Sequence, residues 1–132
     1  MNRMKRFSCA LVAISVLMMH SNPAFAKFAG TVRSDVPWRV EISPETNLVM
    51  FAATITFVDS RGRQDTDVFT TQPGETLAPY DGNIPRGTRR IIIEVDFAPT
   101  GAAGAAVKVI QGTSLITVDA GGETSRIVFD VL

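Results

Sequence analysis

Hydrophobic and polar positions alternate with a period of two over several short stretches of this chain, and the clearest of them covers residues 48–59. One face of this stretch carries the apolar side chains of Phe51, Ala53, Ile55 and Phe57, and the alternate positions carry smaller or more polar residues. This pattern is typical of a β-strand that buries one face and leaves the other lightly polar. We expect it to be a central strand of the fold.

A short polar segment after this stretch predicts a tight reversal of the chain. In Ser60-Arg61-Gly62-Arg63, Gly62 can adopt the positive φ that a tight turn requires. A second alternating run, residues 65–71, follows directly. The two runs are therefore expected to form an antiparallel hairpin.

Further short runs, separated by Gly, Pro, Asn and Asp turn signals, fill the rest of the chain. They are residues 28–33, 38–42, 76–80, 90–97, 107–110, 114–118 and 126–131. We expect the last three to form a closing meander, and no segment shows sustained helical periodicity. Seven or eight short strands without a helix predict an all-β fold, an antiparallel two-sheet sandwich that is immunoglobulin-like or jelly-roll-like.

The beginning of the chain has the features of a secretory signal peptide, which we assign to residues 1–26. Three basic residues precede an apolar run over residues 7–19, and the small residues Ala24 and Ala26 suit a cleavage site before Lys27. The apolar run is shorter than the roughly 20 residues of a transmembrane helix. We therefore expect a periplasmic or secreted protein of a bacterial-type cell envelope.

Cleavage would leave one domain, residues 27–132, with limited chemistry. Cys9 and His20, the only cysteine and the only histidine, both lie in the leader. Disulfides, zinc sites and nucleophile pairs that need Cys or His are excluded from the domain, and we expect no metal and no cofactor. Asp65 and Asp67 offer oxygen ligands for calcium, but the spacing of an EF-hand loop is absent.

The charge and the strand lengths exclude two classes of partner. Three of the 13 Lys and Arg residues belong to the leader, so 10 remain against 13 Asp and Glu, and the net charge of the domain is −3. This charge argues against nucleic acid as the main partner. Several expected strands are shorter than the roughly 9–11 residues of a membrane-spanning strand, so we expect a domain that does not span the membrane.

The loop from Tyr80 to Arg90 is the candidate binding site. It combines the ring of Tyr80, the carboxylate of Asp81, the amide of Asn83 and the guanidinium of Arg86 on an irregular backbone. Loops on a rigid sandwich are common binding positions. In a carbohydrate-binding protein, Tyr80 would stack on a sugar and Asp81 and Asn83 would bond its hydroxyl groups. Ordinary turn residues explain the same composition.

Arginines supply a second interpretation of this region, a basic patch for an anionic polysaccharide or a lipid head group. One group lies in the loop and the strand after it, and the other lies in the hairpin turn. The residues are Arg86, Arg89 and Arg90, with Arg61 and Arg63. The sequence does not determine whether the two groups lie on one side of the molecule.

Two further features have a functional and a structural interpretation. Glu94 and Asp96 lie two residues apart, so their carboxylates share a strand face as in a small glycoside-type hydrolase. Paired carboxylates on a strand are more often a solvated surface, and we expect no enzyme. Trp38, the only tryptophan, can be an exposed platform for a ligand, but a single tryptophan in a small β-domain is more often part of the core.

The first and last strands bear on assembly. Residues 28–33 follow the leader almost at once, and residues 126–131 end the chain on a strand pattern, so both are candidate sheet edges that accept strands from other chains. Alternatively, the two strands pair within one monomer. The leading hypothesis is a non-catalytic exported protein that acts by binding or assembly, with an envelope protein, a polysaccharide or a second copy as partner. The carbohydrate-binding module is the alternative and the hydrolase comes third.

Overall fold

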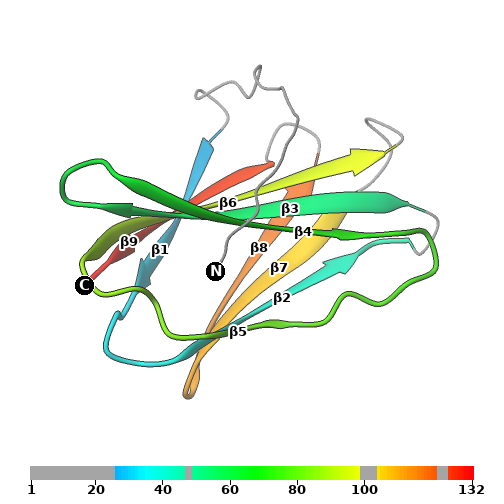
Figure 1. Ribbon diagram of the computed structural model, residues 1–132. Helices are drawn as coiled ribbons and strands as arrows, with labels where there is room; N and C mark the ends of the chain where they lie inside the picture. Colours follow the sequence, from blue (N-terminus) through cyan, green and yellow to red (C-terminus); the bar gives the residue numbers. More distant parts are fainter. Residues whose placement is uncertain (1–25, 47–48, 99–103, 122–124) are drawn as a thin grey trace.

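The computed structural model describes residues 26–46, 49–98, 104–121 and 125–132, and within them the chain forms nine β-strands in two sheets (Figure 1). The all-β, two-sheet sandwich is therefore confirmed, with one or two strands more than expected. The predicted signal peptide lies outside the described residues, except for Ala26, which begins the first strand. In the described ranges, no helix is long and apolar enough to cross a membrane.

The two sheets differ in size. From edge to edge, the five-stranded sheet contains β1 (Ala26–Val32), β9 (Arg126–Val131), β6 (Thr88–Ala98), β3 (Met50–Asp59) and β4 (Gln64–Thr71). The four-stranded sheet contains β5 (Tyr80–Gly82), β2 (Trp38–Pro44), β7 (Gly104–Gln111) and β8 (Ser114–Gly121). All pairings are antiparallel except that of β1 with β9, which is parallel.

The predicted central hairpin is confirmed. β3 pairs with β4 on one side and with β6 on the other, and the four apolar side chains that define its inner face are buried. The turn that joins β3 to β4 places Gly62 at a φ of 82°, which is the left-handed conformation that glycine adopts without a steric cost. The hairpin thus follows directly from the alternating pattern and the glycine.

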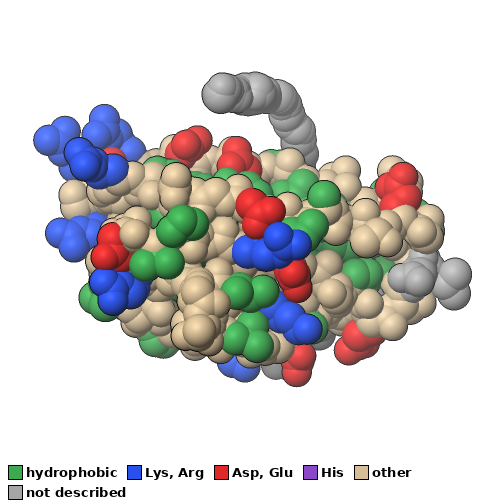
Figure 2. All heavy atoms as spheres, turned by 90° about the horizontal axis from the view of Figure 1, so that it is seen from below, with side chains coloured by type: hydrophobic (Ala, Val, Ile, Leu, Met, Phe, Trp, Pro, Cys, Tyr) green, Lys and Arg blue, Asp and Glu red, His purple; other side chains and the backbone are tan. Residues whose placement is uncertain are grey.

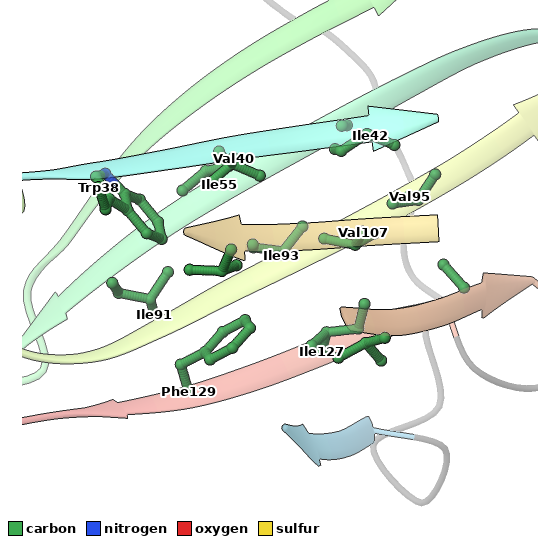
Figure 3. Packing of buried hydrophobic residues seen from close by; sticks show 14 of the residues in the cluster. Trp38, Val40, Ile42, Ile55, Ile91, Ile93, Val95, Val107, Ile127 and Phe129 are labelled. Atoms are coloured by element: carbon green, nitrogen blue, oxygen red, sulfur yellow. The ribbon is translucent and has the colours of Figure 1, made fainter. Parts of the chain in front are cut away.

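The core lies between the two sheets and is made of the inward-facing residues of their strands. Ile55, Ile93 and Ile127 come from the five-stranded sheet, and Val40 and Val107 face them from the four-stranded sheet (Figure 3). Alternation on β6 is also as expected, since Ile91, Ile93 and Val95 are buried. Burial of this apolar surface stabilises the domain, and residues 27–132 contain no cysteine that could add a disulfide.

The last strand corrects two expectations. β9 does not form a meander with β7 and β8, and it is not a sheet edge, because it lies between β1 and β6 in the other sheet. Ile127 and Phe129 face the core, and Val128 between them is half-buried on the outer face. Val128 lies opposite Phe28 of β1 and Ile92 of β6 in the register of the sheet. The two terminal strands therefore pair within one molecule.

The open edges of the sheets are β1, β4, β5 and β8. β1 contains a bulge between Phe28 and Gly30. β4 points Asp65 and Asp67 toward the inner side of its sheet, because its register places them opposite Phe57 and Ile55. Bulges and inward-pointing charges disfavour the addition of a strand from another chain. Of the two terminal strands, only β1 lies at an edge. The hypothesis that molecules assemble through their terminal strands is therefore weakened.

Candidate functional site

Tyr80 and Asp81, two of the predicted binding residues, point to opposite faces of β5. The ring of Tyr80 lies on the inner side, where its centroid is 6.0 Å from that of Trp38 and 6.1 Å from that of Phe69. Asp81 is exposed and lies directly opposite Arg39 on the neighbouring strand. Successive side chains of a strand alternate between its faces, so these two residues cannot contact one ligand side by side.

Tyr80 acts as a bridge between the two sheets. Its hydroxyl donates a hydrogen bond to Oδ2 of Asp67 on β4 at a distance of 2.5 Å. Burial of the ring raises the pKa of Tyr80, and the hydrogen bond to Asp67 and the negative charges of Asp67 and Asp65 raise this pKa further. Because its ring packs against Trp38 and Phe69, Tyr80 does not present a free aromatic surface on which a sugar would stack.

Asp81 belongs to a small charged cluster on the outer face of the four-stranded sheet. Nη1 of Arg39 lies 3.4 Å from Oδ1 of Asp81, and Nε of Arg39 lies 2.9 Å from Oε2 of Glu41. The hydrogen bond to Glu41, followed by the charge of Asp81, raises the pKa of Arg39. The carboxylate of Asp81 is therefore already engaged with a cation in an exposed ion pair.

Asn83 and Arg86 lie on the exposed segment that leads from β5 to β6. Ile84 between them is buried with 4% of its surface exposed, which fixes this segment to the core. The backbone amide and the hydroxyl of Thr88 both donate to the carbonyl of Pro85, at 3.2 and 2.7 Å, and they close a turn with Arg86 near its tip. The site residues that we predicted thus divide between the inner side, the outer face and this turn.

The two groups of arginines, which the sequence left unplaced, lie at the same end of the molecule. The register of β3 and β6 pairs Val58 with Arg90 and Asp59 with Thr88. The turn after β3 and the segment before β6 therefore lie side by side. We call this surface the arginine end, and its members are Arg61, Arg63, Arg86, Arg89 and Arg90.

A β-bulge adds to the exposure of these arginines. The register shifts between Val58 and Asp59, so that Arg89 is the extra residue of β6 at this point. In a regular strand one of two successive side chains would face the core, but Arg89 and Arg90 are both exposed. Bulges re-aim side chains in this way and are common beside functional sites.

Three members of the arginine end have no acidic partner among the described residues. Nε of Arg63 lies 3.1 Å from Asp59, and Nε of Arg90 lies 3.8 Å from Asp130. The members without an ion pair to any described residue are Arg61, Arg86 and Arg89.

The carboxylate of Asp59 organises the hairpin turn rather than neutralising Arg61. Its Oδ1 accepts hydrogen bonds from the backbone amides of Arg61 and Arg63, both at 2.9 Å. Partial burial raises the pKa of Asp59, but these bonds and the guanidinium of Arg63 outweigh it, so the pKa is lowered. The turn that carries Arg61 is therefore held in a defined shape.

Acidic side chains lie at the opposite end of the sandwich. Glu45 and Glu75 come after the ends of β2 and β4. Asp96 and Asp119 lie near the ends of β6 and β8. In Figure 2, several blue side chains gather toward the end that carries the β3–β4 turn and others lie near the middle of the visible face, whereas red side chains are spread over the whole face. The charge of the domain is thus unevenly distributed along its length.

Glu94 and Asp96 lie on the outer face of β6, as the alternation predicts. Glu94 is half-buried between Thr54 and Arg126 on the neighbouring strands, and Asp96 is exposed. Among the described residues, no group of three or more Cys, His, Asp or Glu side chains is placed to hold a metal ion. The register of β3 and β6 and the exposed arginines without an acidic partner make the arginine end the candidate site.

Comparison of the chain with protein-family models, with curated proteins and with solved structures gave no match.

Proposed function

We propose that residues 27–132 form an exported, non-catalytic protein that acts by binding at the cell envelope, and that the arginine end is its binding surface. The observation that carries this proposal is the convergence of five arginines from two segments at one end of a domain with a net charge of −3. Positive charges that lie close together repel one another, and an anionic partner would relieve this repulsion. Such a cluster is therefore suited to binding an anionic partner.

The local structure supports a binding role because the arginines are carried by ordered turns. Asp59 fixes the hairpin turn through the amides of Arg61 and Arg63, and Thr88 closes the turn around Arg86. A surface that is ordered before binding loses less conformational entropy when it meets a partner. Exposed guanidinium groups on such turns can contact carboxylate or phosphate groups in pairs of parallel hydrogen bonds.

The alternative functions have less support. A carbohydrate-binding module that stacks a sugar on Tyr80 would need this ring to leave Trp38 and Phe69. A glycoside-type hydrolase would use Glu94 and Asp96, which lie on the outer face of a central strand. No specific observation favours either alternative over the arginine end.

Co-sedimentation of the purified domain with washed envelope preparations tests the proposal. The triple variant Arg61→Gln, Arg86→Gln and Arg89→Gln removes the three members of the arginine end that have no ion pair with a described residue. We expect this variant to remain in the supernatant under conditions in which the unmodified domain sediments.

A charge-matched control separates the arginine end from net charge. The control variant Lys27→Gln, Lys108→Gln and Arg126→Gln also removes three cations, and all three lie outside the arginine end. It should sediment like the unmodified domain. Equal sedimentation of both triple variants, with both shown to be folded by circular dichroism, would exclude the arginine end as the binding surface.

A further inference from the structure

We infer that the ligand of the arginine end is a linear acidic polysaccharide. This inference rests on the proposed function, and it specifies the chemistry of the partner. Its basis is the arrangement of three exposed guanidinium groups on three separate backbone positions: Arg61 in the hairpin turn, Arg86 in the turn before β6, and Arg89 in the bulge of β6.

The three guanidinium groups come from separate backbone positions, which offers a polymer several points of contact. The two turns leave neighbouring strands of one sheet, and neighbouring strands lie roughly 5 Å apart. Arg61 and Arg86 are therefore carried by two separate turns along the end of the sheet. A chain with a negative group on each repeat can contact several such points at once, and the contacts reinforce one another.

The identity of the cations favours anionic groups that offer oxygens in pairs, such as carboxylate or phosphate groups. All five basic residues of the arginine end are arginines, although the domain also contains lysines at Lys27 and Lys108. A guanidinium presents its donors in a planar fork that matches the paired oxygens of carboxylate and phosphate groups, whereas an ammonium group acts as a compact point charge. The surface is therefore suited to directional contacts with the acidic groups of sugar residues.

A lipid bilayer fits the same surface less well. The exposed large hydrophobic residues of the described ranges include Phe28, Met50, Val68 and Leu115, which lie on strands. Leu132 lies at the arginine end, since β9 ends there, but neither arginine-bearing turn contains an exposed large hydrophobic residue. Stable binding to a membrane surface requires buried apolar area in addition to attraction between charges.

The distribution of charge predicts how a bound chain would lie. Glu45, Glu75, Asp96 and Asp119 lie at the opposite end of the sandwich, whereas Asp59 and Asp130 at the arginine end are paired with Arg63 and Arg90. A polyanion is therefore attracted to the arginine end. Each domain therefore contacts the polysaccharide with one end, and a long chain should take up many domains. The number of domains bound per chain should rise in proportion to the length of the polysaccharide.

Isothermal titration calorimetry with defined probes tests the inference. The probes are polygalacturonate, a linear chain of carboxylated sugars, together with neutral dextran and vesicles of phosphatidylglycerol and phosphatidylcholine. We expect the unmodified domain to bind polygalacturonate, with affinity that falls as salt is added, and to bind dextran and vesicles weakly or not at all. The triple Gln variant at Arg61, Arg86 and Arg89 should lose about tenfold or more in affinity, which corresponds to about 1.4 kcal/mol or more.

The outcomes distinguish this inference from the proposed function. Binding to vesicles that depends on the three arginines, without binding to polygalacturonate, would overturn the polysaccharide and keep the arginine end as the site. Binding to polygalacturonate that is the same for the triple Gln variant and for the Lys27, Lys108 and Arg126 control would overturn the inference as well. If sedimentation of the domain with envelope preparations does not depend on the three arginines, the proposed function is wrong, whichever ligand binds in the calorimetric titrations.

Discussion

The hydroxyl of Tyr80 donates a hydrogen bond to Oδ2 of Asp67 at 2.5 Å, and this bond joins the open edges of the two sheets. Tyr80 lies on β5 at the edge of the four-stranded sheet, and Asp67 lies on β4 at the edge of the five-stranded sheet. Asp67 faces inward because its register places it opposite Ile55. The inward carboxylate thus has two effects: it accepts the bond from Tyr80, and it discourages the pairing of β4 with a strand from another chain.

Loss of this hydrogen bond should weaken the fold. We expect Tyr80→Phe to lower the free energy of unfolding by about 1 kcal/mol, since a hydrogen bond to a charged group contributes more than a neutral one but Asp67 is exposed. Urea unfolding measures the change. In a double-mutant cycle with Asp67→Asn, the two changes should be non-additive. Additive losses would show that the two groups contribute independently.

The raised pKa of Tyr80 predicts a loss of stability in alkaline solution. Burial, and then Asp67, raise this pKa above its unfolded value of about 10. The interaction of the neutral phenol is therefore fully present below pH ~10 and is lost as the pH rises through the folded pKa. Tyr80→Phe should reduce this decline.

The same pKa can be measured directly, because Tyr80 is the only tyrosine of the chain. Absorbance of the phenolate should develop well above pH ~10 in the folded domain, whereas in concentrated urea it should develop near the ordinary value. Titration of the folded domain near pH ~10 would contradict the shielding of this hydroxyl by burial and by Asp67.

Trp38 shows how a buried polar atom changes the cost of a substitution. The ring lies in the core, 5.9 Å from Phe57 between centroids, and its Nε1 has no hydrogen-bond partner among the described residues. Trp38→Ala should cost about 3–5 kcal/mol through the cavity that it leaves. Trp38→Phe should cost much less, because the smaller ring also removes a buried N–H group whose lack of a partner costs about 1–3 kcal/mol.

Urea unfolding followed by circular dichroism compares the two variants, since both lack the only tryptophan. Val40→Ala, two residues further on the same face of β2, provides a control for a cavity without a polar atom. If Trp38→Phe lowers the free energy of unfolding as much as Trp38→Ala does, the unpaired indole N–H does not destabilise the fold by the expected amount.

Much of this fold follows from local pattern. The period-two alternation on β3 and β6 identified the inner faces of both strands, and Gly62 identified the turn between β3 and β4. The burial of Trp38 followed from the preference of a single tryptophan for the core of a small domain. Each of these features depends on residues that are close together in sequence.

The features that position the candidate site depend on pairing over long distances in the sequence. Alternation shows which residues share a face, but it does not show that Val58 pairs with Arg90, and this register brings the two arginine groups together. The opposite directions of Tyr80 and Asp81 were also missed. Gly82 and Pro85 favoured a loop there, whereas the chain forms the short strand β5, in which successive side chains alternate.

The turn that carries Arg61 and Arg63 should be sensitive to its glycine. Gly62 has a φ of 82°, and a Cβ added to it would meet no atom within 4 Å, so a substitution is affected by the backbone conformation alone. We expect Gly62→Ala to lower the free energy of unfolding by about 1–2 kcal/mol, and Gly62→Asn by less, because asparagine tolerates the left-handed region better. Urea unfolding of the two variants checks the order. If the Ala variant is as stable as the unmodified domain, the turn can change to another conformation without a free-energy cost. In that case the arginine end would not be ordered before it binds a partner.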